Sequence, residues 1–113
     1  MKKFLAIYMA PIAELDKMMQ NTSKEQMKEM DATWLKWIDD HKDSFVDVGA
    51  ALGKNKRVTK DGVSDVRNEL TGYSIVQAES HEDACKIFED NPMFEMPGAY
   101  VEVLVWVEMP TTK

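Results

Sequence analysis

Four apolar runs along the chain have the length and composition of β-strands. They are rich in branched and aromatic residues, and glycine, proline or polar residues bound them. Between the second and third runs, a basic stretch over 54–60 followed by the turn signal Asp61-Gly62 predicts a hairpin-like excursion. The expected strands span residues 4–9, 44–48, 70–78 and 99–109.

Apolar residues at three- and four-residue spacing predict a long helix after the first strand. Two overlapping capping boxes mark its start, one led by Thr22 and one by Ser23. A short helix is expected before it over 13–20, and another follows Ser80 and ends at Asn91-Pro92. The apolar stripe of the long helix comprises Met27, Met30, Trp34, Trp37, Ile38 and His41.

The resulting β-α-β-β-α-β order predicts an α+β fold, the ferredoxin-like sandwich, in which both main helices cover one face of an antiparallel sheet. At 113 residues the chain is long enough for one core and too short for two. We therefore expect a single domain over residues 1–113.

The sheet face without helices is expected to be apolar as well. Alternation in the last strand puts the valines from Val101 to Val107, with Met109, on the face that belongs against the helices. The opposite face would be a large exposed apolar patch, which is rare on monomers, so we expect a homodimer that packs two sheets face to face around a cavity. The expected open face bears Phe4, Tyr8, Tyr100, Leu104 and Trp106.

Charge and cysteine content narrow the partners and the compartment. The formal net charge of -6 disfavours nucleic acid and anionic membrane surfaces as partners. No stretch approaches the roughly 20 apolar residues of a membrane span, and the apolar start of the chain is too short for a signal peptide. Cys85 is the single cysteine, which favours a reducing compartment. We expect a soluble cytoplasmic protein.

Over nearly its whole length the sequence resembles the YCII-related family, also called the DGPF domain. This resemblance implies a ferredoxin-like fold and a dimeric α/β barrel, and the biochemical function of the family is mostly unassigned. The motifs that carry it are Lys3-Phe4-Leu5-Ala6-Ile7-Tyr8-Met9, Phe45-Val46-Asp47-Val48-Gly49-Ala50-Ala51-Leu52-Gly53, Asp61-Gly62-Val63, Leu70-Thr71-Gly72-Tyr73-Ser74-Ile75-Val76, Glu79-Ser80-His81-Glu82-Asp83-Ala84 and Asn91-Pro92.

Two features of the family pattern are missing. The Pro-Phe pair of Asp-Gly-Pro-Phe is absent whether that motif is placed on residues 61–64 or on residues 65–68. The histidine that some family members are thought to use with an aspartate would fall near Asp31-Ala32-Thr33, and no histidine stands there. The resemblance therefore transfers no histidine–aspartate mechanism to this chain.

Two carboxylates are the candidate catalytic groups. Asp47 points away from Val46 and Val48 in its strand, where it could face the cavity as a base or could bond nearby amides at the strand end. Glu102 lies on the expected cavity face, with Arg67 as a possible partner. The candidate ligand-binding residues are Phe4, Tyr8, Tyr73, Tyr100 and Trp106.

Three functions remain open at this point. The first is a homodimer that binds a small organic ligand between its sheets, for which an aromatic lining is suitable. The second is a small enzyme of hydrolase or lyase type that uses Asp47 or Glu102 as acid or base. The third is a structural or partner-binding module. No motif predicts a cofactor or a metal ion, and we assign no role to His41 or His81.

Overall fold

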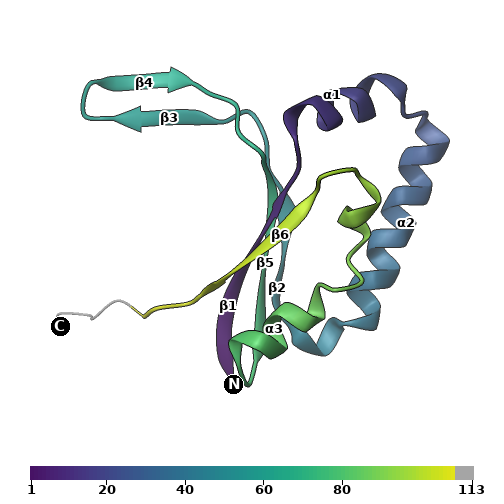
Figure 1. Ribbon diagram of the computed structural model, residues 1–113, viewed down its shortest axis with the longest axis vertical. Helices are drawn as coiled ribbons and strands as arrows, with labels where there is room; N and C mark the ends of the chain where they lie inside the picture. Colours follow the sequence, from purple (N-terminus) through teal and green to yellow (C-terminus); the bar gives the residue numbers. More distant parts are fainter. Residues whose placement is uncertain (109–113) are drawn as a thin grey trace.

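A four-stranded antiparallel sheet in the order β2-β5-β1-β6 is the centre of the structure, a computed structural model that describes residues 1–108. Helices cover one face of the sheet (Figure 1). The arrangement confirms the predicted α+β, ferredoxin-like fold. The elements are β1 (Lys2–Met9), α1 (Ile12–Asn21), α2 (Lys24–Asp40), β2 (Phe45–Ala51), β3 (Lys56–Thr59), β4 (Gly62–Asp65), β5 (Leu70–Ala78), α3 (His81–Ile87) and β6 (Tyr100–Val105), with short 3-10 turns at Lys42–Ser44 and Pro92–Glu95.

The long helix α2 begins at the second of the two predicted caps. The Ser23 hydroxyl accepts a hydrogen bond from the Gln26 backbone N–H, and the Gln26 side chain accepts one from the Ser23 N–H. This reciprocal pair satisfies two amides that have no partner within the helix. α1 and α2 are therefore separate helices, joined at Thr22 and Ser23.

The last strand is shorter than predicted. β6 ends at Val105, which lies opposite Phe4 of β1, and the Trp106 N–H makes one further bond to the Lys3 carbonyl. β1 continues to Lys2, so the ladder ends because residues 106–108 turn away from the sheet (Figure 1). The predicted end of the strand at Met109 lies outside the described residues.

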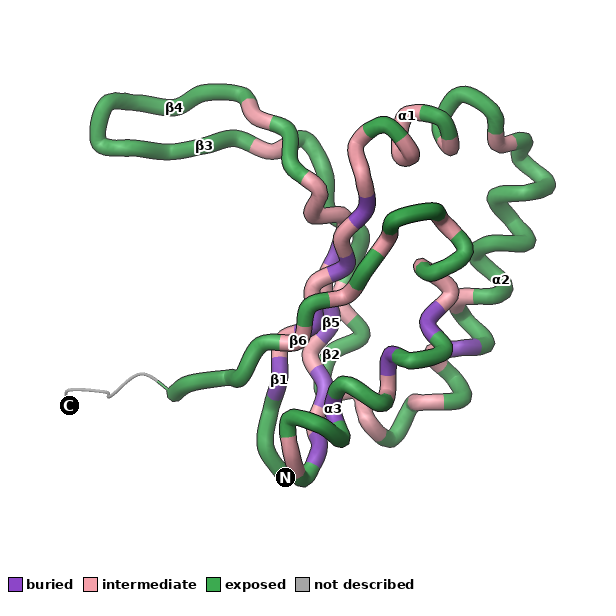
Figure 2. Tube along the Cα trace, in the orientation of Figure 1, coloured by how far each residue is buried: buried purple, intermediate pink, exposed green. Residues whose placement is uncertain are grey.

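The assignment of β1 side chains to faces was wrong. Phe4, Ala6 and Tyr8 are buried in the core under the helices, and the intervening Leu5 and Ile7 occupy the open face. The register explains this, because residues directly opposite each other share a face, and Phe4 lies opposite Val105 while Leu5 lies opposite Leu104. Figure 2 shows the buried positions concentrated along the sheet and on its helix side. Val101 and Val103 pack on this core, as predicted.

The open face is nevertheless apolar. Leu5 lies between Leu104 of β6 and Ile75 of β5, and the next row across the same face is Glu102, Ile7 and Tyr73. Leu104, Trp106 and Tyr100 are all exposed. The prediction of a second hydrophobic sheet face is therefore confirmed, although β1 contributes the other half of its side chains.

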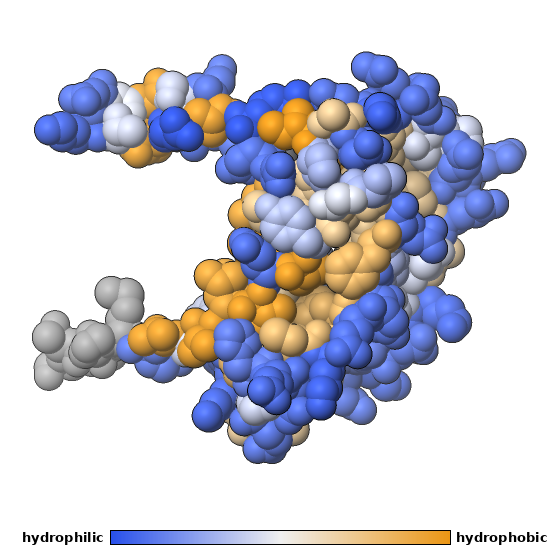
Figure 3. Space-filling model, in the orientation of Figure 1, coloured by the Kyte–Doolittle hydropathy of each residue, from blue (hydrophilic) through white to orange (hydrophobic). Residues whose placement is uncertain are grey.

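Two segments project beyond the open face. The β3–β4 hairpin and residues 106–108 extend away from the sheet on the side opposite the helices (Figure 1). The radius of gyration is 16.0 Å, whereas a compact domain of this length has about 13 Å. Figure 3 shows hydrophobic side chains on the surface between the two projections. A recess with an apolar floor results.

Candidate functional site

A large cavity lies on the helix side of the sheet and opens between α1, α2 and the base of the β3–β4 hairpin. Its volume is about 1100 Å³, which is above the range of roughly 300–1,000 Å³ usual for small-molecule sites. Most of its lining is apolar. The side chains that border it include Leu15 and Met18 of α1, Trp34 and Ile38 of α2, Tyr8 and Leu70 of the sheet, and Met93 and Met96 of the segment before β6.

A directed chain of hydrogen bonds runs along the sheet wall of this cavity. The Ser74 hydroxyl lies 2.6 Å from the carbonyl oxygen of Val48, and the Tyr8 hydroxyl lies 2.7 Å from Ser74 Oγ. Burial raises the pKa of Tyr8 to about 12, although its bond to Ser74 acts in the opposite direction. Tyr8 is therefore neutral at physiological pH.

Charged side chains stand at the mouth of the cavity. Arg67, just after β4, binds Asp16 of α1 with both guanidinium nitrogens, at 2.8 and 3.3 Å. This pairing lowers the pKa of Asp16 and joins the base of the hairpin to the helix that covers the cavity. Lys54 and Asp31 also border the opening. The backbone of Lys54 is in the left-handed region, with φ of 53°, which non-glycine residues seldom adopt.

Residues 65–68, one of the two placements of the family motif, form part of this mouth. Asp31, which also borders the opening, is one of the three residues near which the resemblance places a histidine. For one placement of each feature, the departure from the family pattern therefore lies at this cavity.

Asp47 lies outside the cavity, at the edge of the sheet. It is exposed, its Oδ1 accepts a hydrogen bond from the Gly49 N–H at 2.8 Å, and its Oδ2 accepts one from the Tyr73 hydroxyl at 3.3 Å. Gly49 has φ of +84°, and a Cβ there would stand 1.8 Å from the Tyr73 carbonyl oxygen. The carboxylate thus holds a bulge that only glycine can form. Tyr73 also borders the cavity, although its register with Ile7 puts its side chain on the open face.

Glu102, Tyr100 and Trp106 all lie away from the cavity. Glu102 is exposed on the open face, opposite Ile7. Arg67, its expected partner, binds Asp16 instead. The Tyr100 hydroxyl donates to Glu69 at 2.9 Å, and this carboxylate raises the pKa of Tyr100. The structure therefore brings the Tyr8 side chain to the cavity. Tyr73 borders the cavity but its register puts its side chain on the open face, and the other predicted residues lie on the open face, at the sheet edge or in the core.

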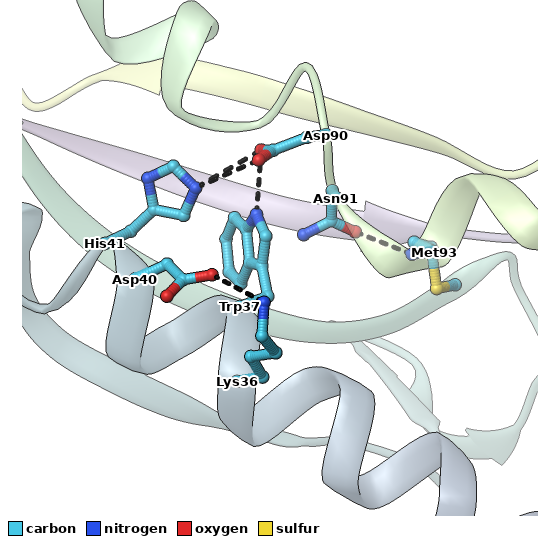
Figure 4. Close-up of polar contacts among 7 residues, drawn as sticks. All are labelled: Lys36, Trp37, Asp40, His41, Asp90, Asn91 and Met93. Carbon is cyan, nitrogen blue, oxygen red and sulfur yellow. Dashed lines mark hydrogen bonds and ion pairs between the residues drawn. The ribbon is translucent and has the colours of Figure 1, made fainter.

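Phe4 and the two histidines have packing and hydrogen-bonding partners outside the cavity. Phe4 is 1% exposed and stacks on His81, whose Nε2–H donates to the Val103 carbonyl at 2.7 Å. His41 Nε2 lies 3.2 Å from an Asp90 oxygen that also accepts from the Trp37 indole N–H (Figure 4). These bonds from Trp37 and then His41 lower the pKa of Asp90. We assign His41 and His81 to the attachment of α2, α3 and β6.

Sequence reasoning missed Ser74, Asp31 and the methionines of the cavity. Ser74 follows from the register alone, since it lies opposite Ala6 on the face that also carries Tyr8. The methionines are spread over α1 and the segment before β6, and nothing in their spacing brings them together.

Within residues 1–108 no helix is long and apolar enough to cross a membrane. In the same part of the chain, no group of three or more histidine, cysteine, aspartate or glutamate side chains is arranged to hold a metal ion.

Comparison with known proteins places the fold and no more. No protein-family model matches the chain, and no curated protein sequence matches it either. Among solved structures, it is similar to 5-chloro-2-hydroxyhydroquinone dehydrochlorinase (TftG) from Burkholderia phenoliruptrix AC1100 in complex with 2,5-dihydroxybenzoquinone, with a TM-score of 0.51 and 18% identity over 88% of this chain and 90% of that one. At this identity the likeness shows that the two chains share a fold.

Proposed function

We propose that this chain is a YCII-related protein that acts as a homodimer and binds a small organic ligand. The observation that carries the proposal is the apolar cavity of about 1100 Å³ with a hydroxyl pair on its wall. Ligand sites combine such an apolar lining with a few fixed polar groups. TftG is a protein of this fold that holds a small organic compound, which supports the proposal.

The ligand site proposed here is the cavity under the helices, in place of the space between two sheets. Tyr8 remains a ligand-binding candidate because its side chain lies on the sheet face that borders this cavity. Phe4 is no longer a candidate, since it is packed into the core.

Support for the homodimer comes from the open face and the two projections beside it. Leu104, Trp106 and the hairpin residues Val58 and Val63 are exposed apolar side chains on this side of the molecule. Charge favours a second copy in the recess. Residues 54–67, which include the hairpin, carry five basic and two acidic side chains, a formal charge of +3. Because the whole chain has a formal charge of -6, the remaining residues together carry -9. The positively charged segment 54–67 of one copy would therefore attract the negatively charged remainder of a second copy.

Ligand binding is tested by thermal unfolding of the protein across a library of small organic compounds, because a ligand of the native state raises the melting temperature. A compound that stabilises the wild type is then measured against Met18→Trp, which fills the cavity. Leu35→Trp is the matched control, since Leu35 lies on the exposed side of α2. Loss of stabilisation in Met18→Trp alone supports the site, and equal stabilisation of both variants contradicts it.

The homodimer is tested by sedimentation velocity at micromolar concentration. We expect a dimer for the wild type and a monomer for Leu104→Glu, which puts a charge on the open face. Leu35→Glu introduces the same charge on α2 and should leave the dimer intact. A wild type that sediments as a monomer contradicts the proposal.

A second candidate function is an enzyme with a carboxylate at this cavity. The observation that favours it is Asp31, which borders the opening and is one of the three residues near which the resemblance places a histidine. If the library yields a compound that is turned over, Asp31→Asn should abolish turnover and leave binding within a few-fold. Unchanged turnover in this variant excludes the acid–base role of Asp31.

A further inference from the structure

The hydroxyl groups on the sheet wall of the cavity all direct their protons into the protein. Thr71 Oγ1 donates to the carbonyl oxygen of Tyr8 at 3.0 Å. The directions of the bonds made by Tyr8 and Ser74 follow from the acceptor at the end of their chain.

Val48 supplies that acceptor. Its carbonyl oxygen can only accept, so the single proton of Ser74 points to it. Ser74 then has no proton left for Tyr8, and the Tyr8 hydroxyl must donate to Ser74 Oγ. Both oxygens keep lone pairs and neither keeps a free proton. Toward the cavity the pair is a hydrogen-bond acceptor only.

The position of the pair makes this polarity matter. Tyr8 is 6% exposed and Ser74 is 2% exposed, so a ligand group that reaches their oxygens would be largely enclosed by protein, where hydrogen bonds are less screened than in water. An acceptor atom of a ligand would meet the oxygen lone pairs of Tyr8 and Ser74 and form no hydrogen bond. Burying such an unpaired polar atom costs binding free energy. A ligand that presents an O–H or N–H would be bound.

We propose that the cavity selects an aromatic ring that carries a neutral hydrogen-bond donor, such as a phenol or an aniline, with the donor on Tyr8 and Ser74. The rest of the lining suits a flat apolar body. Trp34 meets Tyr8 edge to face at 5.2 Å, and Met18, Met93 and Met96 supply thioethers that contact aromatic rings favourably. This selectivity rests on the proposed function, because it names the class of ligand for the same cavity.

The test compares phenol with anisole, which has the same ring and can only accept. Dissociation constants of both compounds are measured by calorimetry or NMR titration for the wild type, Ser74→Ala and Tyr8→Phe. Ser74→Ala frees the Tyr8 proton to donate into the cavity, so it should reverse the polarity of the wall. Ser64→Ala is the matched control, since Ser64 lies on the β3–β4 hairpin outside the cavity.

We expect the wild type and Ser64→Ala to prefer phenol by roughly 10-fold, the effect of one hydrogen bond. In Ser74→Ala the ratio should fall to about 1 or reverse in favour of anisole. Wild-type binding of anisole as tight as that of phenol, or an unchanged ratio in Ser74→Ala, overturns the selectivity while the cavity stands as a binding site. If neither compound binds, both proposals fail for aromatic ligands. Should Ser74→Ala not fold, Tyr8→Phe provides the second test. Ser74 still donates to Val48 in this variant and its oxygen still accepts from a ligand, so the preference for phenol should persist, and a ratio that reverses in favour of anisole overturns the inference.

Discussion

The hydroxyl of Tyr8 lies 2.7 Å from Ser74 Oγ, across β1 and β5, on the sheet face that the helices cover. This contact places Tyr8 at the cavity under the helices, away from the face expected to meet a second subunit. It also gives the apolar cavity a polar group in a fixed orientation. The contact has consequences that are measurable in the isolated protein.

The first prediction concerns stability in alkali. The pKa of Tyr8 is raised to about 12 in the folded chain, whereas an exposed tyrosine has a pKa near 10. The neutral form is therefore favoured in the native state, and its stabilising contribution is complete below pH 10 and lost as the pH rises from 10 to 12. Urea unfolding of wild type and Tyr8→Phe at pH 9, 10 and 11 should show the wild type losing stability relative to the variant. A constant difference across this range contradicts the burial of Tyr8.

The second prediction tests the corrected position of Phe4. Because Phe4 is almost completely buried against His81, Phe4→Ala should lower the free energy of unfolding by about 3–5 kcal/mol. Leu35→Ala, on the exposed side of α2, should change it by about 0.5 kcal/mol or less. Urea unfolding followed by tryptophan fluorescence measures both. A loss of less than about 1 kcal/mol in Phe4→Ala would contradict the buried position and indicate that Phe4 lies on an exposed face.

The third prediction concerns acid. Hydrogen bonds from Trp37 and then His41 hold the pKa of Asp90 below its usual value, so the charged form is favoured in the native state. Its contribution is present above about pH 4, the unfolded pKa, and is lost as the pH falls through the lower folded pKa. The stability advantage of wild type over Asp90→Asn should therefore shrink between pH 5 and pH 2. An advantage that stays level over that interval shows that the Asp90 carboxylate gains nothing from Trp37 and His41.

Much of the fold could be predicted from the sequence because local patterns determine it. The Ser23 capping box, the turn at Asp61-Gly62 and the strand-forming residues Tyr73, Ile75 and Val76 of β5 act over a few residues, and each is found where it was expected. The faces of β1 could not be predicted in the same way. Its side chains are apolar on both sides, so alternation gives no direction, and the register with β6 decides which half is buried.

The cavity was harder to predict than the fold. Its wall joins Tyr8 to Ser74, which are 66 residues apart in sequence, and its mouth pairs Arg67 with Asp16, 51 residues away. The Asp47 carboxylate was a candidate acid or base by residue type, but in the structure it accepts a hydrogen bond from the Gly49 N–H at a strand bulge. Side-chain type suggested candidate residues, and only tertiary contacts show which of them share a site.

The most direct test of the account is an NMR titration of the ¹⁵N-labelled protein with phenol, read at each backbone amide and tryptophan indole. The account predicts that the largest shift changes occur at Gly72, Ser74 and the Trp34 indole, which border the cavity. The amide signals of Tyr100 and Leu104, which lie on the open face, should not shift. Shifts confined to Tyr100 and Leu104, or no shifts at millimolar phenol, would contradict a ligand site under the helices.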